Sequence, residues 1–191
     1  DAAATIVGGA RLLGLTLPPP ALAALGASLG SDVPFCVIGG AAWMRGRGEI
    51  IETFPADPGI GGLSLVVAVP PFPLSTPAVY RAWDELGGPR SGRAVPLPSG
   101  LAGLGLPDHL VNDLEPAAEH VEPRLRPFRE ALEALSGAPA LLAGSGSAYV
   151  VAVTSPARAA VVATQAGAEL RAMAFATGLA ARGVEAQQGP D

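Results

Sequence analysis

Residues 139–153 have the sequence PALLAGSGSAYVVAV, and this stretch sets the architecture of the larger part of the chain. Residues 139–143 are mostly apolar, and residues 148–153 are mainly small or β-branched, so each segment is predicted to be a strand. Four small residues, Gly144-Ser145-Gly146-Ser147, lie between them. We therefore predict two strands joined by a glycine-serine turn.

Strand and helix signals alternate on both sides of this pair. A polar residue followed by proline, as in Ser75-Thr76-Pro77 and Ser155-Pro156, is a typical helix start. The order from residue 63 is strand, helix, helix, strand, strand, helix, strand, which predicts an α+β fold with a ferredoxin-like α/β sandwich. The outer elements are a strand at 63–69, helices at 75–86 and from 112 toward 135 with a break at Pro123, a helix at 155–170 and a strand at 172–179.

The first part of the chain has a different pattern. Residues 1–13 and 21–29 have helical composition, and residues 33–44 and 49–53 are predicted to be two strands joined by the turn at 46–48. Residues 55–62 are rich in proline and glycine, so we place a domain boundary there. The predicted domains are 1–58 and 59–186, followed by a tail at 187–191, and residues 87–107 are predicted to be irregular.

Composition limits the class of protein. The chain has 191 residues, of which 49% are hydrophobic and 15% charged, and this balance indicates a folded globular protein. A net charge of −5 does not favour nucleic acid or an anionic membrane as a partner. All 12 positive residues are arginine, so the chain offers no amine side chain. The single cysteine, Cys36, excludes a disulfide framework and favours a reducing, cytoplasmic location.

Asp32 is the strongest candidate for a catalytic group. It follows Gly30-Ser31 and precedes Val33-Pro34, where an apolar element is predicted to meet a loop. A carboxylate buried there is costly unless it is hydrogen-bonded, charge-paired or functional. The alternative interpretation is an aspartate that caps a helix or stabilises a turn.

Three other positions carry candidate chemistry. The turn at 144–147 could bind an anion through exposed backbone N–H groups, although it could equally be a plain hairpin turn. Tyr80 could stack on a base, or it could pack into the core. His109 and His120 are not at metal-ligand spacing with other ligands, so we assign no metal site. Cys36 is expected to be a small buried hydrophobic residue.

Several motifs occur together in one order, and as a set they resemble the GHMP kinase superfamily. The resemblance covers nearly the whole chain and is weakest across 87–107 and after residue 155. The matching segments are DAAAT at 1–5 with RLLGL at 11–15, LGSDVPF at 29–35, GRGE at 46–49, STPAVY at 75–80, NDLE at 112–115 and GSGS at 144–147.

The resemblance implies a two-domain GHMP kinase fold whose C-terminal domain is the α/β sandwich. It implies transfer of the ATP γ-phosphoryl group to the 2-hydroxyl of a cytidine diphosphate-linked methylerythritol, in isoprenoid biosynthesis, with Mg²⁺ expected alongside ATP. Asp32 matches the catalytic aspartate. The nucleotide would be bound by the helix beginning at Asp1 and by Gly144, Ser145 and Gly146, and the substrate by Tyr80 and Ser147.

The chain departs from this family pattern in two respects. The family's partner lysine and its glycine-rich phosphate loop precede the segment matching Asp1, and neither is found in this sequence. We therefore expect an N-terminally incomplete chain that is inactive by itself. Two alternatives remain: another GHMP kinase acting on homoserine, mevalonate or a sugar, and a catalytically dead homologue with a binding or structural role.

Overall fold

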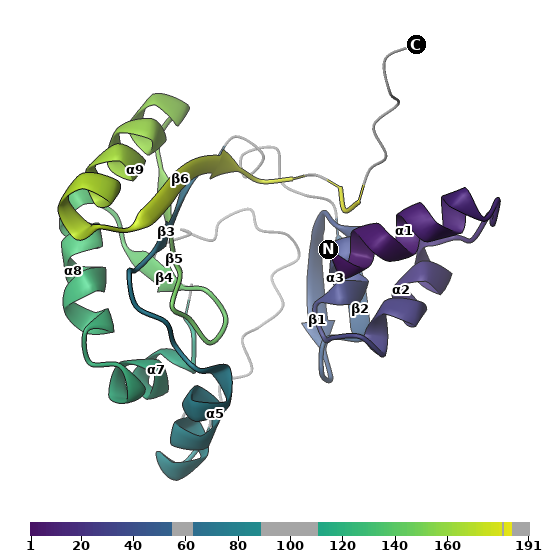
Figure 1. Ribbon diagram of the computed structural model, residues 1–191, viewed down its shortest axis with the longest axis horizontal. Helices are drawn as coiled ribbons and strands as arrows, with labels where there is room; N and C mark the ends of the chain where they lie inside the picture. Colours follow the sequence, from purple (N-terminus) through teal and green to yellow (C-terminus); the bar gives the residue numbers. More distant parts are fainter. Residues whose placement is uncertain (55–62, 89–110, 181, 185–191) are drawn as a thin grey trace. The chain divides into compact units, whose positions relative to one another are not determined.

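A computed structural model describes residues 1–54, 63–88, 111–180 and 182–184 (Figure 1). These residues form two compact units, one made of 1–54 together with 180 and 182–184, and the other of 63–179 with its gap. The predicted linker at 55–62, most of the predicted irregular segment at 87–107, His109 and the predicted tail lie outside the described residues.

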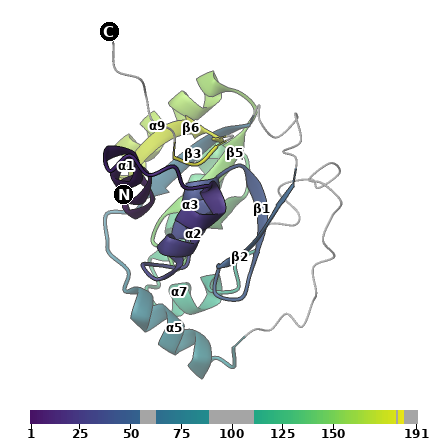
Figure 2. The same cartoon turned by 90° about the vertical axis from the view of Figure 1, so that its right-hand side faces the viewer.

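The first unit contains three helices and a two-stranded antiparallel sheet (Figure 2). The sheet aligns Ala41 with Phe54 and Arg45 with Ile50. The core of this unit is formed by small and branched side chains of the three helices: Ala3, Val7, Ala10, Leu22, Ala23 and Val37. The elements are α1 (Ala2–Leu12), α2 (Pro19–Ala27), α3 (Val33–Ile38), β1 (Ala41–Arg45) and β2 (Ile50–Phe54).

The prediction of a strand beginning at residue 33 is wrong, because Val33–Ile38 forms a helix. Its β-branched residues suggested a strand, but Pro34 stands in the first turn, where its fixed φ suits a helix and its missing N–H is not needed. Pro34 and Val37 are both buried, and a spacing of three residues places them on one helix face. The strand of this region begins later, at Ala41.

Residues 182–184 pack against the first unit, although the sequence analysis assigned 59–186 to the second domain. The N–H of Gly183 donates to the carbonyl of Ile38 at 3.3 Å. Gly39 has φ +69°, and a Cβ there would collide with the backbone of Arg182 and Gly183. This close approach of two backbones requires glycine and could not be predicted from local patterns.

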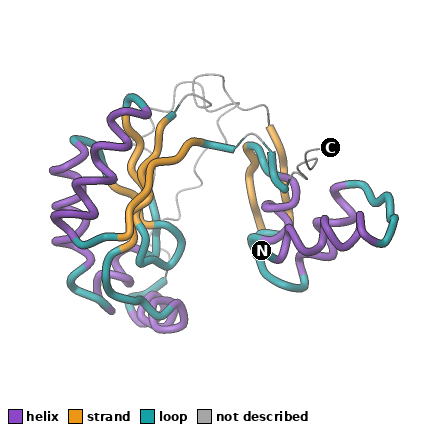
Figure 3. Tube along the Cα trace, turned by 45° about the horizontal axis from the view of Figure 1, so that its top comes forward, coloured by secondary structure: helices purple, strands orange, loops and turns teal. Residues whose placement is uncertain are grey.

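The second unit has the predicted ferredoxin-like arrangement, so the α+β fold class is confirmed. Its four strands are antiparallel in the order β4-β5-β3-β6. Helices α8 and α9 cover one face of this sheet, while α5 and α7 lie together beyond one of its ends (Figures 1 and 3). The elements are β3 (Ser64–Val69), α5 (Thr76–Glu85), α7 (Glu115–Val121), α8 (Leu125–Ser136), β4 (Ala140–Leu142), β5 (Tyr149–Val153), α9 (Pro156–Leu170) and β6 (Met173–Gly178).

The first and last strands of this unit are neighbours. Strand β3 pairs with β6 along its whole length, from Ser64 opposite Gly178 to Val69 opposite Met173. The chain therefore enters and leaves the second unit at adjacent positions, at the same end of these two paired strands.

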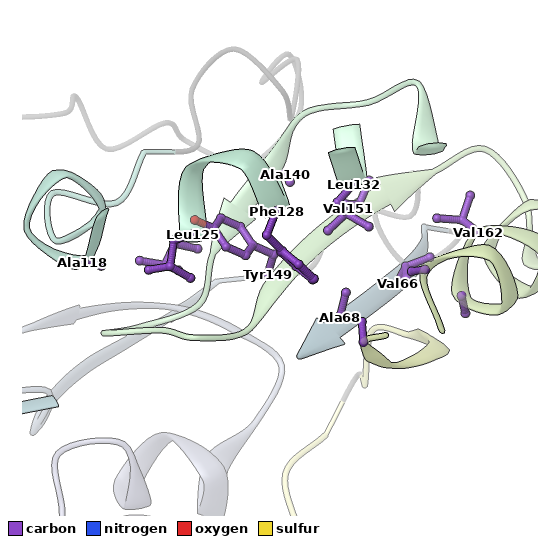
Figure 4. Packing of buried hydrophobic residues seen from close by; sticks show 14 of the residues in the cluster. Val66, Ala68, Ala118, Leu125, Phe128, Leu132, Ala140, Tyr149, Val151 and Val162 are labelled. Carbon is purple, nitrogen blue, oxygen red and sulfur yellow. The ribbon is translucent and has the colours of Figure 1, made fainter. Parts of the chain in front are cut away.

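The core of the second unit lies between the sheet and the covering helices (Figure 4). Alternate residues of β3 and β5 are buried, as expected when one face of a sheet is covered. Tyr149 is fully buried, and its ring lies 6.0 Å from that of Phe128. Burial raises the pKa of the Tyr149 hydroxyl above its usual value, which keeps this group neutral.

A charged cluster centred on Arg129 joins α7 to α8. Its guanidinium lies 3.2 Å from the Glu119 carboxylate, 3.6 Å from Glu115 and 3.9 Å from Glu133. Burial raises the pKa of Glu115 above its usual value, while the positive charge of Arg129 acts in the opposite direction. Arg126 also pairs with Glu119, at 2.8 Å, but its side chain is mostly exposed.

Candidate active site

The turn at 144–147 joins β4 to β5 and is closed by backbone hydrogen bonds. The N–H of Ala143 donates to the carbonyl of Ala148 at 2.8 Å, and the N–H of Gly146 donates to the carbonyl of Ala143 at 2.9 Å. Within the described residues, the N–H groups of Gly144 and Ser145 donate no hydrogen bond. A turn of small residues with free N–H donors has the chemistry needed to bind an anion such as a phosphate.

The start of α5 contacts this turn through its first side chain. The hydroxyls of Thr76 and Ser145 lie 2.7 Å apart and share one hydrogen bond. Ser75 is the N-cap residue of α5, but its side chain makes no capping bond. Thr76, predicted from the sequence as part of a helix start and of the motif at 75–80, therefore links α5 to the turn.

Tyr80 lies one helical turn after Thr76, and its side chain is 51% exposed. The alternative that Tyr80 packs into the core is therefore wrong. Trp83, on the same helix, packs against the core instead. An exposed aromatic ring near the turn can stack on a planar ligand, so the stacking role of Tyr80 stays a prediction.

Asn112 contacts the turn from a third segment. Its side-chain amide donates to the carbonyls of Leu142 at 2.8 Å and Gly144 at 2.7 Å, and its oxygen accepts from the N–H of Leu114 at 2.9 Å. In the sequence, Asn112 is recognisable only as part of a motif that opens a helical region. Its spacing of 30 residues from the nearer carbonyl left no signal for this contact in the sequence.

Asp32, in the first unit, occupies the N-cap position of α3 and is exposed. Its side chain makes no capping hydrogen bond, so the helix-capping alternative is wrong for the side chain. Of the three possibilities expected for this carboxylate, neither a hydrogen bond nor a charge pair is found within the described residues, and a functional role stays a prediction. Because the group is exposed, it needs no such compensation. Its carboxylate is therefore available to a ligand.

The turn between β1 and β2 supports the segment that carries Asp32. The N–H of Arg47 donates to the Glu49 carboxylate at 2.7 Å, and backbone N–H groups of Glu49 and Arg47 lower the pKa of this carboxyl. Gly48 has φ +112°, and a Cβ there would stand 2.5 Å from the carbonyl oxygen of Ser31. Only glycine allows this contact beside Asp32.

Gly48→Ala is expected to lower the free energy of unfolding by about 2–4 kcal/mol, because it adds a backbone collision to an unfavourable φ. Gly14→Ala is the matched control. Gly14 also has a positive φ, +66°, but nothing lies within 4 Å of its added Cβ, so a loss of only about 1 kcal/mol is expected. Urea denaturation measures both variants. Equal losses would mean that the turn does not contact Ser31.

The remaining predicted residues have simpler surroundings. Asp1 is the N-cap residue of α1 and is exposed, with no side-chain capping bond. Cys36 is exposed, so the expectation of a buried residue is wrong. Among the described residues, no group of three or more His, Cys, Asp or Glu side chains could hold a metal ion. In the same part of the chain, every helix is too short or too polar to cross a bilayer.

Asp1 and Asp32 thus belong to the first unit, and Tyr80 and residues 144–147 to the second. Within the second unit, the structure joins Thr76 and Asn112 to the turn.

Several curated proteins of one name are similar to this chain. No family model matches the chain. A 4-diphosphocytidyl-2-C-methyl-D-erythritol kinase of Moorella thermoacetica is 42% identical over 154 residues, which cover 78% of this chain and 53% of that protein. The enzyme of the same name from Cutibacterium acnes is 39% identical over 165 residues, covering 83% and 52%.

The fold agrees with these sequences. The crystal structure of a 4-(cytidine 5′-diphospho)-2C-methyl-D-erythritol kinase matches 93% of this chain and 63% of its own, with a TM-score of 0.73 and 31% identity. The predicted resemblance to GHMP kinases is therefore confirmed. A homoserine kinase from Cytophaga hutchinsonii, 16% identical with a TM-score of 0.67, shares the GHMP kinase fold and covers 95% of this chain and 64% of its own.

The chain spans about half the length of the curated relatives it matches. Of the predicted site residues, Asp32 and Tyr80 are exposed and Ser145 is half-buried. A ligand can therefore reach all three.

Proposed function

We propose that the protein phosphorylates 4-diphosphocytidyl-2-C-methyl-D-erythritol at its 2-hydroxyl, with ATP as the phosphoryl donor, in the non-mevalonate route to isoprenoids. The observation that carries this proposal is the 42% identity to a kinase of that name over most of the chain. The 31% identical crystal structure supports it independently through the fold.

Asp32 is the proposed catalytic residue. Its exposed and unpaired carboxylate can accept the proton of the substrate hydroxyl. As that proton leaves, the hydroxyl oxygen forms a bond to the γ-phosphorus of ATP, and the bond between this phosphorus and the leaving oxygen of ADP breaks. The chain contains no lysine, so within this sequence Asp32 has no amine partner.

The second unit is proposed to bind both ligands. The free N–H groups of Gly144 and Ser145 suit the phosphates of ATP, with Gly146 completing the turn, and the N-terminus of α1 at Asp1 in the first unit offers a further set of donors. Tyr80 would stack on the cytosine ring, and Ser147 would contact the substrate. Mg²⁺ would neutralise the phosphates of ATP, and we assign no residue of this chain to it.

A substrate panel with the full-length protein tests the proposal. We expect ATP-dependent transfer to the cytidine diphosphate-linked methylerythritol, detected as a new phosphomonoester by phosphorus NMR, and at least 100-fold lower kcat/KM with homoserine, mevalonate or galactose. Preference for one of these alcohols would replace the proposal with another GHMP kinase activity. Absence of transfer to all four, together with unimpaired folding, would favour a catalytically dead homologue.

A further inference from the structure

We infer that Asn112 is a positioning residue that holds the glycine-serine turn at 144–147 in its ligand-binding shape. The inference rests on the proposed function, because the turn is taken to bind the phosphates of ATP. Asn112 itself is not placed in contact with either ligand.

The contacts of Asn112 use nearly all of the capacity of its side chain. An asparagine amide has two N–H donors, and here one reaches the Leu142 carbonyl at the end of β4 and the other reaches the Gly144 carbonyl inside the turn. Both distances, 2.8 and 2.7 Å, are those of well-formed hydrogen bonds. The side chain therefore ties the first residue of the turn to the strand that leads into it.

These bonds also orient the turn. Because the carbonyl of Gly144 is held by Asn112, the peptide that follows it has its N–H, on Ser145, on the opposite side. The Ser145 side chain is held separately by Thr76. Asn112 and Thr76 thus fix the two consecutive residues whose N–H groups are free to bind an anion.

Asn112 also has a local role, since its oxygen accepts from Leu114 at the start of α7. This role could be filled by aspartate, which is an equally good acceptor near a helix start. Aspartate could not make the two hydrogen bonds to Leu142 and Gly144, because its carboxylate oxygen would face two carbonyl oxygens. Aspartate and alanine at this position therefore separate the two roles.

The experiment compares Asn112→Asp, Asn112→Ala and Ser136→Ala in the full-length protein. Ser136 is the matched control because its hydroxyl also bonds backbone groups of the second unit, those of Glu133 and Ala138. Steady-state kinetics give kcat and KM for ATP. Amide hydrogen exchange of Ala143 and Gly146, whose N–H groups close the turn, reports its order without reference to activity.

We expect Asn112→Asp to raise KM for ATP on the order of tenfold or more, and to speed exchange at Ala143 and Gly146, because a displaced turn no longer presents its donors. Ser136→Ala is expected to leave both readouts unchanged. If Asn112→Asp matches the wild type while Asn112→Ala is impaired, Asn112 serves only the start of α7 and the inference is wrong.

Failure of the proposed function gives a different result. In that case the wild-type protein transfers no phosphoryl group, and exchange alone tests Asn112. Unchanged exchange at Ala143 and Gly146 in Asn112→Asp then overturns the inference, and faster exchange confined to the turn supports it.

Discussion

Asp32→Asn is expected to lower kcat by about 10²- to 10⁴-fold in the full-length protein, because an amide cannot accept the proton of the attacking hydroxyl. KM for ATP should change little, since the side chain is proposed to act on the acceptor. Asp32 is exposed and its side chain makes no capping bond, so the free energy of unfolding should change by less than about 0.5 kcal/mol. The measurement is steady-state kinetics combined with urea denaturation.

Asp84→Asn is a suitable control for this loss of activity. Asp84 is another exposed aspartate, on α5, and it has no assigned role in the reaction. Its replacement should leave kcat within about twofold of the wild type. Full turnover in Asp32→Asn would remove Asp32 from the mechanism, whereas equal losses in both variants would point to a general effect of lost charge.

Arg129→Met is expected to destabilise the second unit by about 2–3 kcal/mol at neutral pH. It leaves three carboxylates without their shared partner, and Glu119 and Glu115 are largely buried, with 9% and 23% of their side chains exposed. Removal of one partner from a fully buried ion pair costs about 3–5 kcal/mol, and the 28% exposure of Arg129 reduces this figure. Urea denaturation followed by circular dichroism gives the free energy of unfolding.

Arg126→Met provides the comparison, because Arg126 pairs with the same Glu119 but its side chain is 64% exposed. A loss below about 1 kcal/mol is expected there. Acid should also distinguish the two variants. The folded-state pKa of Glu115 is already raised and should rise further without Arg129, so Glu115 becomes protonated as pH falls through that value and the deficit of Arg129→Met shrinks. Equal losses in both variants, or a deficit that is constant with pH, would contradict the proposed role of the cluster.

Most of the second unit could be predicted from the sequence, because its signals are local. Proline after serine or threonine marks the starts of α5 and α9, and small or β-branched runs mark β3 and β5. The order of these elements then indicates a ferredoxin-like sheet. In α3 the local signals conflicted: its β-branched residues favoured a strand, while Pro34 and tertiary packing of Val37 favoured a helix.

The site was predictable only in part. Asp32 and the glycine-serine turn are recognisable as residue types in a motif, whereas the residues that support them depend on contacts between distant segments. Asn112 reaches the turn across 32 residues, and Gly48, which follows α3 and β1 in the chain, makes room for Ser31, which precedes them. Such contacts follow from the folded topology, and no periodicity or spacing in the sequence encodes them.

The pairing of Ser64 with Gly178 has a practical consequence for protein engineering. Paired residues in antiparallel strands lie only about 4.5–5.5 Å apart between their Cα atoms, so the two ends of the 63–179 segment need almost no bridging distance. A segment with adjacent ends at the surface can be transplanted as a cassette into a loop of an unrelated host without stretching the host backbone.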